Sequence, residues 1–149
     1  FVYQPLPYVK NIYYLDVDLY RYFIGRADQS VNEQVMVRRV DQQLRVTRIM
    51  LACPSPYDLP ERQKNLASYM LNYLSMMVAI SSVFLTISGT PESLEKKAQL
   101  WKELSEGDPR LYRRMKLFSV SAFTNLPGGL GNHLTVLLYR GVQKIYKFN

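Results

Sequence analysis

Cysteine and histidine are almost absent from this chain of 149 residues, which has one of each, Cys53 and His133. A single cysteine excludes an internal disulfide framework and is typical of proteins from a reducing compartment. One residue of each type is too few for a zinc site built from histidine and cysteine alone. His133 has no neighbouring serine, cysteine or aspartate that marks a catalytic triad, and Cys53 has no histidine partner in sequence. The sequence therefore indicates no catalytic group of these types.

Acidic residues are outnumbered, since 12 Asp and Glu stand against 19 Lys and Arg, which gives a formal charge of +7. A basic surface attracts nucleic acid, anionic lipid or phosphorylated ligands. The cations are spread over at least three predicted helices rather than concentrated on one reading element, so we do not expect a nucleic-acid partner. Asp16 and Asp18 have the spacing of carboxylates that share a divalent cation, but no further acid lies nearby, and we predict no metal site in this chain.

Complete phosphate-binding motifs are missing. The glycine-rich stretch 126–132 lacks the Gly-Lys-Ser/Thr ending of a P-loop and the full spacing of a dinucleotide motif, so we interpret it as a connection between helices. The loop Arg26–Val31 suits an anion better. Arg26 offers a guanidinium fork and Gln29 and Ser30 add neutral donors, while backbone amides at the start of a following helix would assist.

The N-terminal part of the chain favours extended structure, since Pro5 and Pro7 exclude a helix. Tyrosine, isoleucine, valine and phenylalanine then predict two short strands, Ile12–Leu15 and Leu19–Ile24. Phe1 is not an initiator methionine and no signal-peptide pattern follows it, so we expect a processed chain or a domain of a longer protein.

Helical periodicity follows. Helices are predicted over residues 32–53, 61–88, 91–106, from 108 toward 125, and about 130–147. The residues expected to cap their starts are Ser30 or Asn32, Asp58, Thr90 and Asp108. The residues expected on the apolar side of the last helix are Leu130, Leu134, Leu137, Leu138 and Ile145. The predicted fold class is mainly α: a helical bundle of about five helices preceded by a short β segment.

The run Leu66–Ser88 has no charged residue and is long enough to span a bilayer. It also contains Asn72, several serines and two tyrosines, which make it a mediocre membrane segment. A central helix buried on most sides of a bundle explains the same pattern, and we favour that reading over a membrane span or an interfacial helix.

The stretch Tyr14–Val31 resembles the end of the catalytic domain in bacterial family 2 glycosyltransferases, which have the GT-A fold. In that family the chain commonly ends as Leu-Tyr-x-Tyr, followed after a few residues by Arg-x-x-Gln-Ser-Val. Here Leu19-Tyr20-Arg21-Tyr22 and Arg26-Ala27-Asp28-Gln29-Ser30-Val31 match these motifs. The closing segment Lys144–Asn149 is similar to the tails of such proteins, while the helices between show little resemblance.

The resemblance implies that residues 1–30 are a β-rich remnant of the end of a GT-A domain and that residues 31–149 form a helical C-terminal accessory domain. Such a chain is not expected to catalyse transfer alone, because the family's nucleotide-binding half, with its metal-binding Asp-x-Asp and catalytic base, lies earlier. Arg26 and Ser30 are then candidate contacts for the donor diphosphate, and Gln29 for the sugar or acceptor.

The resemblance also implies partners. The parent enzyme would use a nucleotide sugar, a polysaccharide or lipid-linked acceptor and a divalent metal, Mg or Mn, whereas no cofactor is expected within this chain. The location would be the cytoplasm, at or near the inner face of the membrane, and a homodimer is a further candidate assembly. Two alternatives stay open: a non-enzymatic basic helical interaction module, and a peripheral membrane domain with Leu66–Ser88 against lipid.

Overall fold

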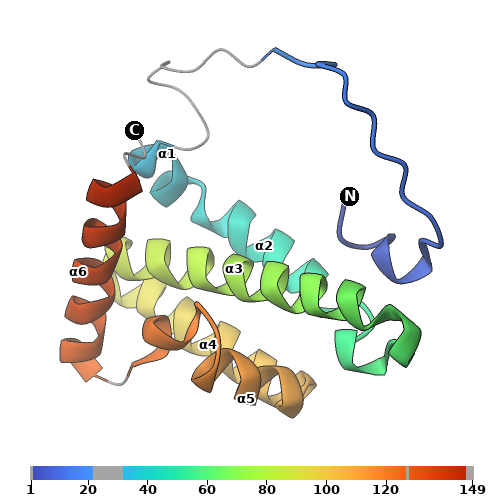
Figure 1. Cartoon of the computed structure of the whole chain (residues 1–149). Coiled ribbons are helices and arrows are strands. Elements are labelled where there is room, and N and C mark those ends of the chain that lie inside the picture. Colours follow the sequence, from blue (N-terminus) through green and yellow to red (C-terminus); the bar gives the residue numbers. More distant parts are fainter. Residues whose placement is uncertain (1, 22–31, 127, 147–149) are drawn as a thin grey trace.

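The computed structural model describes residues 2–21, 32–126 and 128–146, which form a helical bundle (Figure 1). Its α-helices are α1 Glu33–Arg38, α2 Val40–Leu51, α3 Lys64–Ser88, α4 Pro91–Gly107, α5 Pro109–Leu117 and α6 Gly128–Tyr146. Short 3₁₀ turns are η1 Leu6–Tyr8, η2 Pro56–Asp58, η3 Glu61–Gln63 and η4 Ala122–Asn125. The predicted helical bundle is therefore confirmed.

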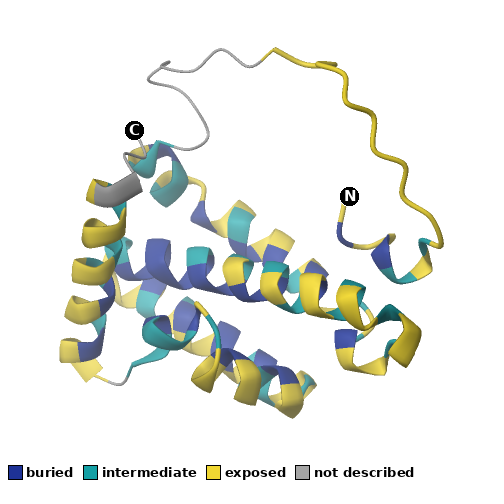
Figure 2. Cartoon of the chain, in the orientation of Figure 1, coloured by how far each residue is buried: buried dark blue, intermediate teal, exposed yellow. Residues whose placement is uncertain are grey.

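Helix α3 is the centre of the bundle and packs against α2, α4 and α6 (Figure 2). Every residue from 81 to 86 is buried, so this part of the helix is covered on all sides. By length and apolar composition the segment Glu61–Ser88 is sufficient to cross a membrane, and 61% of its most apolar window is buried inside the bundle. The long uncharged run thus packs as a core helix in this structure.

Three serines of α3, at positions 75, 81 and 82, are buried together with hydrogen-bond partners. Ser81 Oγ lies 2.8 Å from Thr47 Oγ1 of α2, and Ser82 Oγ accepts from Trp101 Nε1 of α4 at 3.0 Å. Ser75 Oγ lies 3.3 Å from Ser121 Oγ. Buried hydroxyl groups need such partners, because leaving one unsatisfied costs about 1–3 kcal/mol. Three of the polar residues that made this run a mediocre membrane segment therefore join α3 to its neighbours.

Apolar side chains fill the bundle in two clusters along α3. The larger cluster contains Tyr3, Leu6, Met50, Met70, Leu74, Val78, Trp101, Leu104, Leu111 and Met115. The smaller contains Val40, Leu44, Phe84, Leu85 and Leu100. Tyr3 precedes η1 and Leu6 begins it, so the N-terminal segment is part of the core, and the Tyr3 ring meets the Tyr73 ring edge-on at 5.8 Å.

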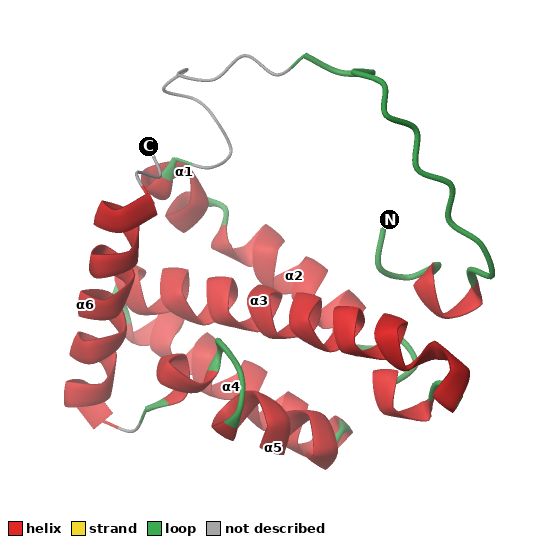
Figure 3. Ribbon diagram, in the orientation of Figure 1, coloured by secondary structure: helices red, strands yellow, loops and turns green. Residues whose placement is uncertain are grey.

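The predicted strands Ile12–Leu15 and Leu19–Ile24 are not seen. Residues 9–21 run outside the bundle as an extended, exposed loop with no strand among them (Figure 3), and residues 22–24 lie outside the described part of the chain. The Leu19 amide bonds to the Val17 carbonyl at 2.9 Å, which bends the chain locally. β-favouring residues form a strand only when another strand takes up their backbone bonds, and the described residues supply none.

Side-chain caps start three of the helices as predicted. Asn32 accepts from the Gln34 amide at 3.0 Å, Thr90 from Ser93 at 3.1 Å, and Asp108 from Arg110 and Leu111 at 2.9 and 3.1 Å. Asp58 was the wrong choice for the second helix. It ends η2, whose cap is Ser55, because two 3₁₀ turns intervene before α3 begins.

The helix predicted over 32–53 is divided into α1 and α2 at Arg39, where φ is −104° and ψ is 16°. No glycine or proline marks this position in the sequence. The break allows Val35 on α1 and Val40 on α2 both to be buried. For this reason the described residues form six α-helices, where about five were predicted.

Helix α6 turns its small and polar side toward the bundle. Thr135 is fully buried and donates to the Phe123 carbonyl at 3.0 Å, while Gly131 lies so close to Leu126 that a Cβ there would stand 2.5 Å from the Leu126 oxygen. Tyr139 packs edge-on against Phe84 at 5.9 Å. The predicted apolar side faces away from the bundle, with Leu130, Leu134, Leu137 and Leu138 exposed.

Candidate functional site

The predicted site residues Arg26, Gln29 and Ser30 lie outside the described residues, so the structure does not place them. Candidate sites are therefore sought in the pockets that the described residues line. Four of these pockets carry polar or charged groups: one between η2 and the start of α5, one along α5, one where α4 meets α6, and one along α6 itself.

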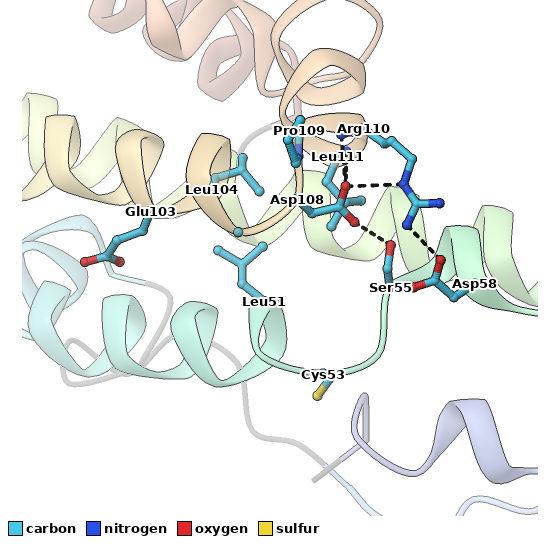
Figure 4. A pocket seen from close by; sticks show the side chains of 11 residues that line it. Leu51, Cys53, Ser55, Asp58, Glu103, Leu104, Asp108, Pro109, Arg110 and Leu111 are labelled. Atoms are coloured by element: carbon cyan, nitrogen blue, oxygen red, sulfur yellow. Dashed lines mark hydrogen bonds and ion pairs between the residues drawn. The ribbon is translucent and has the colours of Figure 1, made fainter.

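The first is a pocket of about 370 Å³ at the junction of α2, η2, α4 and α5, which we call the capping pocket (Figure 4). Its lining residues are Leu51, Cys53, Ser55, Asp58, Glu103, Leu104, Gly107, Asp108, Pro109, Arg110 and Leu111. Ser55 Oγ donates to Asp108 Oδ2 at 2.6 Å, and Arg110 Nη2 donates to Asp58 Oδ1 at 2.7 Å. Arg110 Nε lies 3.6 Å from Asp108 Oδ1.

Hydrogen bonding determines the charge of Asp108. Burial alone would raise the pKa of this carboxyl, but the bonds from Ser55 and from the Leu111 and Arg110 amides, with the Arg110 charge, hold its pKa below the ordinary value. A carboxylate at the start of α5 also complements the helix dipole. The network thus keeps Asp108 ionised as a cap.

Neither nucleophile in the capping pocket is activated. Ser55 directs its proton to Asp108, which caps α5, and no histidine lines the pocket. Burial raises the pKa of the Cys53 thiol, which points away from the polar network in Figure 4 and lies 3.4 Å from the Ile49 carbonyl. A thiol with a raised pKa is a poor nucleophile near neutral pH. We therefore interpret the pocket as a structural contact between η2 and α5 rather than as an active site.

The second pocket, of about 340 Å³, lies along α5 and is lined by Tyr57, Pro109, Arg110, Arg113, Arg114 and Phe118. We call it the arginine groove. Arg110 stacks over the Tyr57 ring at 5.4 Å and is also held by Asp58. The side chains of Arg113 and Arg114 are exposed and form no ion pair or hydrogen bond within the described part of the chain. Two uncompensated guanidinium groups in a pocket that two aromatic rings also line suit an anionic ligand, especially a phosphate or diphosphate.

The third pocket, of about 190 Å³, lies beside Lys97 and is lined by Leu94, Lys97, Ala98, Asn125, Leu126, Gly128 and Asn132. Lys97 is 6% exposed, and its ammonium donates to Thr86 Oγ1 at 3.0 Å and to Asn132 Oδ1 at 2.9 Å. Burial lowers the pKa of Lys97 to about 8. No carboxylate pairs with it among the described residues.

An amine with this pKa is partly neutral near pH 8 and has the character of a base or nucleophile. The pocket is smaller than typical ligand sites, which start at about 300 Å³, and no second titratable group lines it. Lys97 instead links α4, α3 and α6 through its two bonds. The sequence held a signal for its burial, because Lys97 follows Leu94 by three residues and precedes Trp101 by four.

The described residues contain no group of three or more His, Cys, Asp and Glu side chains that could hold a metal ion. Asp16 and Asp18 are exposed in the extended loop 9–21. Comparisons of the chain with protein-family models, with curated proteins and with solved structures find no match. The arginine groove is therefore the candidate functional site that the geometry favours.

Proposed function

We propose that the chain is the helical C-terminal accessory domain of a glycosyltransferase that moves a sugar from a nucleotide sugar to a polysaccharide or lipid-linked acceptor. The observation that carries the proposal is the loop 9–21. Its residues favour strands, and yet Tyr13, Tyr14, Leu15 and Leu19 are 88%, 81%, 59% and 82% exposed. Extended apolar chain of this kind fits a segment whose sheet partner belongs to another domain.

The resemblance of residues 14–31 to the end of a GT-A domain identifies the kind of domain that would supply the partner strand. The loop is fixed at its N-terminal side by η1, whose Leu6 packs in the core, and the helices resume at Asn32, which caps α1. A sheet that received residues 9–21 would therefore lie against the bundle. In this arrangement Arg26, Gln29 and Ser30 belong to the seam between the two domains, with the roles that the resemblance implies.

The arginine groove would then serve the acceptor. Lipid-linked and polysaccharide acceptors present phosphate groups or sugar rings, and the groove offers the guanidinium groups of Arg113 and Arg114 beside the rings of Tyr57 and Phe118. The parent enzyme's chemistry would be attack of an acceptor hydroxyl on the anomeric carbon of the nucleotide sugar. Its divalent metal would be bound by the catalytic domain and would stabilise the departing diphosphate.

The gene provides the first test. The proposal requires a GT-A domain with an Asp-x-Asp motif encoded before residue 1, and a gene that encodes none contradicts it. The second test is transfer from a nucleotide sugar by the protein that contains both domains. Arg26→Ala should weaken donor binding by roughly tenfold or more, since a charge-assisted bond is worth about 1.5–3 kcal/mol. Arg38→Ala on α1 is the matched control, and unchanged transfer by the triple alanine variant of Arg26, Gln29 and Ser30 would disprove these roles.

The arginine groove is tested in the same protein with a different readout. The double variant Arg113→Ala/Arg114→Ala should raise the KM for the acceptor and leave the KM for the donor unchanged. Arg62→Ala, an exposed arginine of η3, is the control. A change in the KM for the donor alone would show that the groove does not bind the acceptor.

A non-enzymatic interaction module is the second candidate. It is favoured by the two other pockets, because neither nucleophile of the capping pocket is activated and no second titratable group lines the pocket beside Lys97. On this reading the arginine groove would bind an acidic partner. The double variant Arg113→Ala/Arg114→Ala would then weaken binding of this partner and leave sugar transfer unchanged.

A further inference from the structure

The outer side of α6 carries an exposed row of large apolar side chains, which we call the leucine face. It comprises Leu130, Leu134, Leu137, Leu138 and Val142, with exposures of 87%, 43%, 68%, 40% and 45%. These residues recur at the three- and four-residue spacing of one helix side. Figure 2 shows α6 at one edge of the bundle with exposed residues along most of its length.

This orientation is the reverse of an ordinary surface helix, which buries its apolar side. The bundle contacts α6 through Gly131, Asn132 and Thr135 instead, by close approach and by hydrogen bonds. Rotating α6 to bury its leucines would break these bonds, so the exposure follows from specific contacts. A contiguous apolar surface of this kind marks an interaction site.

The charges beside the leucine face identify the kind of partner. Residues 128–149 contain Arg140, Lys144 and Lys147 but no aspartate or glutamate. Arg140 is held by Glu33 of α1 at 2.6 and 2.8 Å, whereas Lys144 makes no ion pair within the described part of the chain. A groove of about 630 Å³ runs next to the leucines, with Leu137 and Gly141 among its lining and His133, Arg140 and Lys144 as its polar groups.

Leucines flanked by lysine and arginine, on a helix that has no acidic residue of its own, are typical of helices that lie in the interface of an anionic bilayer. A second copy of this chain is a disfavoured partner. Contact between two leucine faces would place Lys144 and the other cations of one copy against the same cations of the other. Residues 81–86 of helix α3 are not available for this contact, since the bundle covers them on all sides. We propose that the leucine face of α6 docks the protein on an anionic lipid surface, with the leucines in the interface and Lys144 at the headgroups.

This inference does not depend on the transferase activity and is tested on the chain itself. Flotation of the protein with vesicles of phosphatidylcholine alone, and of equimolar phosphatidylcholine and phosphatidylglycerol, measures the partition coefficient at low and high salt. We expect binding to the phosphatidylglycerol vesicles, little binding to phosphatidylcholine, and release by salt.

Two variants address the surface. Leu130→Ser/Leu137→Ser should lower the partition coefficient at least about tenfold, because the leucine side chains no longer enter the interface. Lys144→Glu should lower it roughly 30-fold, since it replaces an attraction by a repulsion. Leu117→Ser, which changes a leucine of 57% exposure outside α6, and Arg62→Glu, which makes the same change of net charge on η3, should retain most of the binding.

All of these positions are exposed, so each variant should keep the unfolding midpoint of the unmodified chain, which circular dichroism in urea verifies. Absence of binding to the phosphatidylglycerol vesicles overturns the proposal. So does binding that the leucine-face variants and the control variants weaken equally. A dimer that sedimentation detects and that Leu130→Ser/Leu137→Ser abolishes, without vesicle binding, would assign the face to a second copy instead. Capture of an acidic protein segment without vesicle binding would likewise overturn the lipid assignment.

Discussion

Thr47 Oγ1 of α2 and Ser81 Oγ of α3 lie 2.8 Å apart, and neither residue exposes any surface. Each hydroxyl also lies within bonding distance of a carbonyl one turn earlier on its own helix, that of Gln43 at 3.0 Å and that of Met77 at 2.8 Å. Each oxygen has only one proton, so one hydroxyl donates across the interface while the other donates to its own backbone. The two hydroxyls therefore couple α2 to α3. Replacing one of them removes the bond between the helices, while the other hydroxyl can still donate to the carbonyl of its own helix.

We expect Thr47→Val and Ser81→Ala each to lower the free energy of unfolding by about 1 kcal/mol. The double variant should lose less than the sum, with an interaction energy of about 0.5–1 kcal/mol, because the second change removes a group that has already lost its partner. Urea unfolding of the four proteins of this cycle provides the measurement. Additive losses would show that the two hydroxyls do not interact.

Asp108 is the cap whose removal should matter most. Asp108→Ala should destabilise the chain by about 1–2 kcal/mol, because it removes the cap of α5 and the acceptor of Ser55. Asp58→Ala is the matched control. It breaks an ion pair with Arg110 in which both side chains are more than half exposed, so its effect should stay below about 1 kcal/mol.

The contribution of Asp108 has a defined pH dependence. Its pKa is lower in the folded than in the unfolded chain, so its stabilisation is complete above the unfolded pKa and is lost as the pH falls through the folded pKa. Stability measured in urea at acidic pH should therefore decline less steeply in Asp108→Ala than in the unmodified chain. Parallel curves would contradict the assigned direction.

For Lys97 we expect a pH dependence of the same sign, in the alkaline range. Burial lowers its pKa from 10.5 to about 8, so between these values the unfolded chain binds more protons and the free energy of unfolding rises with pH. The total gain should be up to ~3 kcal/mol. Below pH 8 the cost of burying the charged ammonium is fully present. Lys97→Met has no proton to release and should lack this rise, whereas the exposed Lys102→Met should retain it in urea titrations across the same range.

Two glycines of α6 provide a contrast in packing. At Gly131 a Cβ would stand 2.5 Å from the Leu126 carbonyl oxygen, so Gly131→Ala should push α6 away from η4 and cost about 1–3 kcal/mol. At Gly141 nothing lies within 4 Å of the same atom, and Gly141→Ala should stabilise the helix by about 0.5–1 kcal/mol. Thermal unfolding of both variants tests the pair, and equal shifts would rule out the close approach.

Local chemistry made much of the fold predictable. Thr90 and Asp108 each precede a proline, and this cap-then-proline pattern marked the starts of α4 and α5 correctly. The helix around Leu66–Ser88 followed from its apolar composition. Caps and helices depend mainly on neighbours within a few residues, which the sequence displays.

Features that depend on distant residues were not predictable in the same way. Whether Ile12–Leu15 forms a strand depends on a partner strand, and the break at Arg39 depends on where α1 meets α3. The buried side of α6 is set by Lys97, Phe123 and Leu126, so leucine spacing alone indicated the apolar side without showing that it faces outward. The arginine groove likewise joins Tyr57 to α5, which is about a third of the chain further on. The site predicted at Arg26, Gln29 and Ser30 stays a prediction.

The anchoring of η1 has a consequence for how the chain responds to cleavage. Tyr3 and Leu6 are seated in the main core cluster, while residues 9–21 that follow are exposed. A protease that cuts in this loop would sever the backbone without removing either side chain from its place on α3. The N-terminal peptide would then stay bound to the bundle without a covalent link. The cleaved protein would migrate as one species until it is denatured.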